Sequence, residues 1–133
     1  MINVYLAGQP DEYENNWKQK FQTGSGFVFF DWEIHADQSS AEMFFPQDLE
    51  AIKNSHVLIA NPGTAPSEGT WFEIGYFYAL NTNKPGEFCD NLIIIWNKNR
   101  VPKWSYVFIE RSGHMVTTVE EAKVKLYEIG KQT

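Results

Sequence analysis

The 133-residue chain is short of the features that mark disulfide-linked, metal-binding and membrane-spanning proteins. It has a single cysteine, Cys89, which excludes an intrachain disulfide and a cysteine-rich zinc site. No apolar run approaches the roughly 18 residues that a membrane helix needs. Basic residues number 11 against 17 acidic ones, and the formal net charge of -6 argues against a nucleic-acid backbone or an anionic membrane as the main partner.

The sequence also lacks several motifs of enzyme active sites. His35, His56 and His114 lie on different predicted elements and show no metal-ligand spacing. There is no Gly-x-Ser-x-Gly nucleophile elbow and no Walker phosphate loop. The N-terminus has no basic segment before its first apolar run. We therefore expect a cytoplasmic protein without a metal or a cofactor, folded as one domain over residues 1–133.

Aromatic side chains are in excess. The chain has 5 Trp, 6 Tyr and 10 Phe, which together make up 16% of its residues. A small domain buries so many rings with difficulty, so an open cleft, a subunit interface or both are expected.

Apolar runs alternate with amphipathic stretches, and this alternation is typical of an α/β fold with a parallel sheet covered on both faces. The apolar runs predict strands at residues 2–7, 27–30, 56–60, 91–96 and 106–109. The amphipathic stretches predict helices at residues 11–21, 40–54, 70–80 and 119–129. In such a fold a ligand binds beyond the carboxyl ends of the strands.

Some boundaries of these elements carry their own expectations. Pro46 suits a first helical position, and Thr117 or Thr118 suits the cap of the last helix. Residues 31–40 are polar and irregular, which predicts a loop. Residues 114–116 are expected to extend or cap the fifth strand.

The segment Asn61–Gly75 gives the clearest indication of chemistry. A loop with prolines and glycines leads into a helix start near Thr70, where unpaired backbone amides can hold an anion. Glu73 lies about one turn further, and beside a helix N-terminus its carboxylate is expected to stay ionised, as a nucleophile toward a sugar carbon requires. The Thr70-x-x-Glu73 spacing also fits a capping box, and spacing alone favours that interpretation.

Three segments together resemble the nucleoside 2-deoxyribosyltransferase family: Val4–Gly8, Asp48–Ala60 and Gly69–Tyr76. They have the family's order and spacing over about the first two thirds of the chain, and Gly-Thr-x-x-Glu-Ile-Gly-Tyr is the most specific piece. The resemblance implies a three-layer flavodoxin-like fold with a five-stranded parallel sheet in the order 2-1-3-4-5. It also implies that Glu73 attacks C1′ of a 2′-deoxynucleoside, forms a covalent deoxyribosyl-enzyme and passes the sugar to a second base.

The resemblance implies roles for further residues. Asp48 matches a family aspartate that helps to position the glutamate and the sugar, although it also fits an acidic residue in the first turn after Pro46. Trp32 and His35 follow the second strand, where the family places contacts with the base. The other residues expected at the substrate are Tyr5, Gly8, Ser67, Glu68, Gly69 and Ser105. For Tyr5 a place in the core is the alternative.

One position departs from the family's transferases, which commonly carry an aspartate six residues before the nucleophile. Here that position is Ser67, and Glu68 is one residue out of register. The Pro66-Ser67 pair is more similar to the related 2′-deoxynucleoside 5′-phosphate N-hydrolases, in which the serine contacts the 5′-phosphate. Ser67 also fits a turn or a helix cap. The acidic loop Gly8–Glu12 argues against a phosphate site.

The favoured function is therefore transfer of deoxyribose from a 2′-deoxynucleoside to another base. The alternatives are hydrolysis of a 2′-deoxynucleoside 5′-monophosphate, with water as the acceptor, and a nucleotide-binding module without turnover. The expected partners are a deoxynucleoside or deoxynucleotide and a free nucleobase. Members of the family complete their sites across subunits, so the resemblance and the aromatic excess together predict a homodimer or a larger homo-oligomer.

Overall fold

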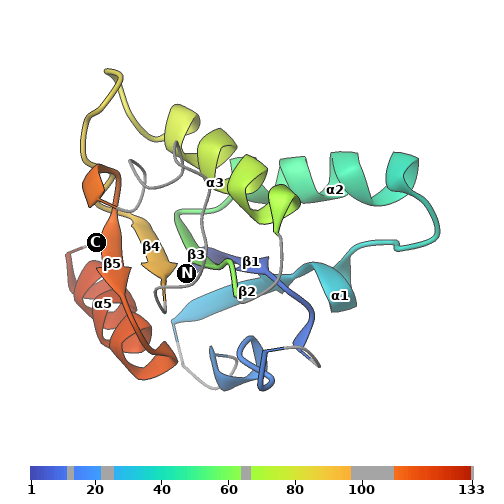
Figure 1. Cartoon of the computed structure of the whole chain (residues 1–133), viewed down its shortest axis with the longest axis horizontal. Helices are drawn as coiled ribbons and strands as arrows, with labels where there is room; N and C mark the ends of the chain where they lie inside the picture. The colour runs from blue at the N-terminus through green and yellow to red at the C-terminus, as the bar shows by residue number, and fades with distance from the viewer. Residues whose placement is uncertain (12–13, 22–25, 64–66, 97–109, 133) are drawn as a thin grey trace.

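The computed structural model describes residues 1–11, 14–21, 26–63, 67–96 and 110–132 (Figure 1). Its strands are β1 (Ile2–Gly8), β2 (Phe27–Asp31), β3 (Val57–Asn61), β4 (Leu92–Ile95) and β5 (His114–Val116). They form a five-stranded sheet in the order β2-β1-β3-β4-β5, and every neighbouring pair is parallel. The predicted α/β class and the strand order 2-1-3-4-5 are confirmed.

Helices cover both faces of the sheet and give three layers (Figure 1). The helices α2 (Ala41–Lys53) and α3 (Glu68–Leu80) pack against each other on one face. On the other face, α5 (Val119–Lys131) packs against β4 and β5. None of the described helices is both long and apolar enough to cross a membrane.

The sheet is buried on both faces, which explains the continuous apolar runs of its strands. Side chains alternate along a strand, so Tyr5 and Ala7 of β1 join the core beneath α2 and α3. Val4 and Leu6 point the opposite way and join the core beneath α5. Tyr5 is therefore a fully buried core aromatic, which was the alternative to a place at the substrate, and it is not among the residues that line the cleft described below.

The last helix follows its predicted pattern closely. Thr118 is the N-cap of α5, and its hydroxyl accepts a hydrogen bond from the backbone N–H of Glu121. Ala122 and Leu126 are buried one turn apart, as the predicted apolar stripe requires. Local sequence and tertiary packing agree here, because this helix presents one face to the sheet and the other to solvent.

The helix predicted for residues 11–21 is wrong. The described part of this segment consists of turns, followed by the single 3-10 turn η2 (Gln19–Phe21). The Asp11 carboxylate accepts hydrogen bonds from the backbone N–H groups of Lys18 and Gln19. A polar side chain that binds nearby backbone donors competes with the helical hydrogen-bond ladder, and here it wins.

Helix boundaries also differ from the predictions. The helix α2 begins at Ala41, so Pro46 lies inside it and not at a first helical position. A proline there removes one backbone hydrogen bond, but the helix continues on both sides of it. The segment 31–40 is not wholly a loop, because it begins with the one-turn helix α1 (Trp32–His35).

The fifth strand is formed by residues 114–116, which were expected only to extend or cap it. Residues 106–109, predicted as that strand, lie outside the described residues. The short β5 pairs with β4 through Ile93, Ile94 and Ile95, the most β-prone run of the chain.

Replacing Gly8 with alanine should destabilise the protein, and replacing Gly75 should not. A Cβ on Gly8 would collide with the backbone oxygen of Asn61 and lie 2.7 Å from Cζ2 of Trp17, whereas a Cβ on Gly75 meets nothing within 4 Å. We expect Gly8→Ala to lower the free energy of unfolding by about 1–3 kcal/mol. Gly75→Ala, inside α3, should raise it by about 0.5–1 kcal/mol. Urea denaturation measures both, and equal effects would contradict the contact at Gly8.

Candidate functional site

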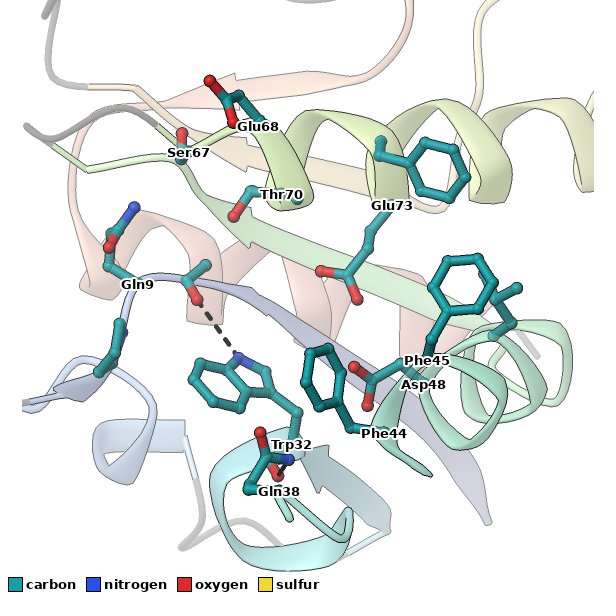
Figure 2. A pocket seen from close by; sticks show the side chains of 15 residues that line it. Gln9, Trp32, Gln38, Phe44, Phe45, Asp48, Ser67, Glu68, Thr70 and Glu73 are labelled. Carbon is teal, nitrogen blue, oxygen red and sulfur yellow. Dashed lines mark hydrogen bonds between the residues drawn. The ribbon is translucent and has the colours of Figure 1, made fainter. Parts of the chain in front are cut away.

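A cleft of about 570 Å³ opens beyond the carboxyl ends of β1 and β2, between α2 and the first turns of α3 (Figure 2). Its position is the one predicted for a ligand in a parallel α/β sheet, and its volume suits a small organic molecule. Its walls carry three acidic side chains, Asp48, Glu68 and Glu73. No lysine or arginine is among the described residues that line it.

Glu73 extends from the second turn of α3 into this cleft (Figure 2). The Tyr5 hydroxyl, 68 residues away in the sequence, donates a hydrogen bond to Oε2 of Glu73. Because Ser67 is the N-cap of α3, Glu73 lies too far along the helix to cap it. The capping-box interpretation of Thr70 and Glu73 is therefore wrong.

The electrostatic environment of Glu73 differs from the one predicted. Burial raises the pKa of the Glu73 carboxyl to about 7, the hydrogen bond from Tyr5 opposes this rise, and the charge of Asp48 adds to it. The cation of Lys18 also opposes it. The expectation that a helix N-terminus keeps Glu73 ionised is therefore wrong, since Glu73 lies beyond the first turn. Near neutral pH both its forms are populated.

Asp48 projects from α2 into the same part of the cleft (Figure 2). It lies well past the first turn of α2, so a favourable interaction with the helix N-terminus does not explain it. Its Oδ1 atom is buried and has no hydrogen-bond partner within the described part of the chain. Burial raises the pKa of Asp48 to about 6. A buried acceptor without a partner is costly, and a hydroxyl of a bound ligand would satisfy it.

Trp32 forms a wall of the cleft at the start of α1. Its indole N–H donates a 3.3 Å hydrogen bond to the carbonyl oxygen of Gly8, another lining residue (Figure 2). The Gln38 side-chain amide donates to the backbone oxygen of Trp32 at 2.9 Å. The first of these bonds holds the indole beside Gly8, the last residue of β1, and the second ties the backbone of α1 to Gln38. The contact between Trp32 and a base, expected after the second strand, stays a prediction.

The His35 side chain does not point into the cleft. Its Nδ1 accepts a 2.9 Å hydrogen bond from the backbone N–H of Asp31, and its ring packs on Phe30 with centroids 5.4 Å apart. It lines a separate, smaller pocket of about 290 Å³ and not the cleft. A contact between His35 and a ligand in the cleft would require this ring to move.

Ser67, Glu68 and Gly69 line the cleft at the start of α3 (Figure 2). Ser67 is the N-cap, but its side chain makes no capping hydrogen bond. The cap interpretation is therefore confirmed for the position of Ser67, while its hydroxyl makes no hydrogen bond to the start of the helix. Ser105 lies outside the described residues. The roles of these residues toward a ligand stay predictions.

Several lining residues were missed by the sequence analysis. Aromatic rings from α2 and α3 meet across the cleft rim, where Phe45 and Phe72 have centroids 6.2 Å apart and are 50% and 56% exposed. The adjacent pair Phe44-Phe45 is a signal for this, because two successive helical residues cannot both face the core. The other lining residues that were not singled out as site residues are Gln9, Pro10, Gln38, Leu49 and Thr70.

The chain is similar to known proteins and matches the family model described as nucleoside 2-deoxyribosyltransferase over residues 4–99. No curated protein matches it. Among solved structures, the Clostridium botulinum CMP N-glycosidase BcmB is similar, with a TM-score of 0.50 and 23% sequence identity over 93% of this chain and 97% of that chain. At this identity the likeness shows a shared fold.

Removing the charge of Glu73 should stabilise the protein at high pH. A carboxyl with a raised pKa in the folded state makes stability fall as the pH rises from about 4.5, its ordinary value, to about 7. We expect Glu73→Gln to raise the free energy of unfolding at pH 8 by about 1–3 kcal/mol, and by much less at pH 4.5. Urea denaturation at both pH values measures this.

The matched control is Glu120→Gln, which removes an exposed carboxylate on α5. It should change stability by less than about 0.5 kcal/mol at either pH. A Glu73→Gln effect of the same size at pH 4.5 and pH 8 would contradict the raised pKa.

Proposed function

This chain belongs to the nucleoside 2-deoxyribosyltransferase family, and we propose that it cleaves the N-glycosidic bond of 2′-deoxynucleosides and transfers the deoxyribose to another nucleobase. The family relation itself supports an enzyme that acts on glycosidic bonds of nucleosides or nucleotides. In this proposal Glu73 is the nucleophile and Asp48 its positioning partner. The observation that carries it is the Glu73 carboxylate, held at one oxygen by Tyr5 and directed into a cleft of nucleoside size.

The proposed reaction has two displacements at C1′. In the first, a carboxylate oxygen of Glu73 bonds to C1′ while the C1′–N bond breaks, and the electron pair and a proton from solvent end on the departing base. In the second, a nitrogen of another base attacks C1′, loses its proton, and releases the Glu73 carboxylate. Two such displacements retain the configuration at C1′. A 2′-deoxy sugar eases both steps, because no 2′-hydroxyl destabilises the cationic transition state.

The hydrogen bond from Tyr5 supports the role of Glu73. Burial of the Tyr5 ring and the nearby Glu73 charge raise the pKa of Tyr5 well above its usual range, so its hydroxyl stays a donor. The hydrogen bond from Tyr5 to Oε2 favours the ionised form of the Glu73 carboxyl and fixes the orientation of the carboxylate. In this proposal the other oxygen, Oε1, is then directed at the substrate. The raised pKa of Glu73, about 7, also makes its carboxylate more basic and therefore more nucleophilic than an ordinary glutamate in the first displacement.

The walls of the cleft suit a base and a sugar. Trp32 and the phenylalanines of α2 and α3 offer ring faces for a planar base. Asp48 offers its buried Oδ1 to a sugar hydroxyl, which would satisfy that atom. The sugar would then lie between Asp48 and Glu73, with the base toward Trp32.

A mechanism-based inhibitor tests the nucleophile directly. A 2-fluoro-arabinosyl nucleoside should leave its sugar on the protein, because fluorine slows breakdown of the covalent intermediate more than it prevents formation. Peptide mass spectrometry should place the adduct on Glu73. Glu73→Gln should form no adduct and lose about 10³-fold or more of the turnover rate. Glu68→Gln, which removes another cleft carboxylate, should still be labelled, and an adduct on Glu68 or Asp48 would contradict the assignment.

Hydrolysis of a 2′-deoxynucleoside 5′-monophosphate is the second candidate function. Ser67 favours it, because its hydroxyl makes no capping hydrogen bond and lies at a helix start, where backbone amides can bind a phosphate. The acidic lining argues against it, since Asp48, Glu68 and Glu73 repel an anion and no described lining residue is cationic. These charges are the reason to prefer an uncharged nucleoside.

The acceptor distinguishes the two candidates. With 2′-deoxyadenosine and added cytosine, we expect exchange to 2′-deoxycytidine, and slow release of base from 2′-deoxyadenosine 5′-monophosphate in water alone. Chromatography of the products measures both. Rapid release of base from the monophosphate without exchange would support the hydrolase. Binding of nucleoside without any product would favour a binding module.

A further inference from the structure

Lys18 is a fully buried cation close to the cleft, and nothing in its sequence context distinguishes it from a surface lysine. Its side chain has 0% exposure. Its ammonium group lies 2.7 Å from Oδ1 of Asp31 and is ion-paired with Oε2 of Glu33. It also lies 4.5 Å from the centroid of the Trp32 ring, so one cation contacts three consecutive residues.

The ammonium group holds together carboxylates that would otherwise repel. One carboxylate oxygen from each of Asp11, Asp31 and Glu33 lies within 4.8 Å of the other two. The Asp11 backbone N–H donates to Oε2 of Glu33, and the Asp11 carboxylate accepts from the backbone N–H of Lys18. Without Lys18, these three carboxylates would be partly buried without a compensating positive charge. Their repulsion would favour separation of the segment after β1, which carries Asp11, from the segment that carries Asp31 and Glu33.

The contacts of Lys18 determine the position of the Trp32 ring. A four-residue helix such as α1 cannot hold its own conformation, so its tertiary ties decide where the indole lies. Lys18 binds the residues on both sides of Trp32 and covers part of its ring. Because Lys18 is fully buried, the ring surface that it covers is closed, while Trp32 still lines the cleft.

We propose that Lys18 is a positioning residue of the base subsite: it holds the Trp32 indole as a rigid wall on which the planar base stacks, without contacting the substrate. This inference rests on the proposed function, since it assigns the base to Trp32. Stacking is present in the bound substrate and in the transition state alike. Its loss therefore raises KM more than it lowers kcat.

A double-mutant cycle tests the proposal with 2′-deoxyadenosine as substrate. The assay is run at pH 8.5, well above the pKa of Glu73, so that loss of the Lys18 charge changes the ionisation of Glu73 little. Under this condition we expect Lys18→Met and Trp32→Leu each to raise KM about tenfold, in line with the loss of one base–aromatic stack, and to change kcat less than about threefold. The double variant should have the KM of Trp32→Leu alone, because Lys18 acts through Trp32. Lys20→Met is the matched control; it removes an exposed lysine two residues away and should leave both constants unchanged.

A second variant covers the case in which Lys18→Met fails to fold. Glu33→Gln removes one of the two ion pairs of Lys18. Because the Glu33 side chain is 31% exposed, the fold should persist. This variant should raise KM by a smaller factor than Lys18→Met does. Added to Trp32→Leu, it should leave KM unchanged. Additive effects in either cycle, or equal falls in kcat and kcat/KM, would overturn the proposal.

Binding separates this proposal from the proposed function. In Glu73→Gln protein, 2′-deoxyadenosine should quench the fluorescence component that Trp32→Leu removes, and Lys18→Met should weaken that binding about tenfold. Binding without turnover by the unmodified protein would defeat the proposed function and leave the role of Lys18 intact. Binding that Lys18→Met does not alter would overturn the role of Lys18, and no binding at all would overturn both.

Discussion

The cleft depends on keeping the carboxyl group of Glu73 in a half-buried position beside a second acid, Asp48. Burial favours the neutral form of each group, and the charge of Asp48 adds to this effect on Glu73. Two opposing interactions limit the rise of the Glu73 pKa: the hydrogen bond from Tyr5 and the positive charge of Lys18. The balance leaves this carboxyl ionisable near neutral pH, which is the condition a nucleophile needs.

The parallel sheet brings these groups together. The crossover connections bring Asp48 of α2 and Glu73 of α3 to one cleft beyond the carboxyl ends of the strands, and the buried Tyr5 of β1 contacts Glu73 from the core. The wall of the cleft that Trp32 forms does not depend on the sheet alone. An ionic cluster around Lys18 stabilises it by joining the segment after β1 to the short helix after β2. A regular scaffold and an irregular ionic cluster thus meet at one cleft.

The predictions succeeded where one local pattern dominates. The apolar runs of β1 and β3 and the stripe of α5 reflect burial that repeats along the element, so periodicity finds them. They failed where a single side chain decides the backbone. Asp11 diverts residues 11–21 from a helix, because its carboxylate binds backbone donors that a helix would use. The helix α3 also begins earlier than the Thr70 spacing suggests, with Ser67 as its N-cap, although no side-chain hydrogen bond of Ser67 marks this start.

The alternation of apolar and amphipathic stretches was sufficient to predict the α/β class, because it is carried by neighbouring residues, and the family resemblance supplied the strand order; both are confirmed. The roles of Glu73 and Asp48 toward a substrate stay predictions. The environment of Glu73 was decided by folding. Its pKa depends on burial and on Tyr5, which is 68 residues away in the sequence. The same holds for Lys18, since a lysine next to a tryptophan in sequence says nothing of the carboxylates and the indole that enclose it in space.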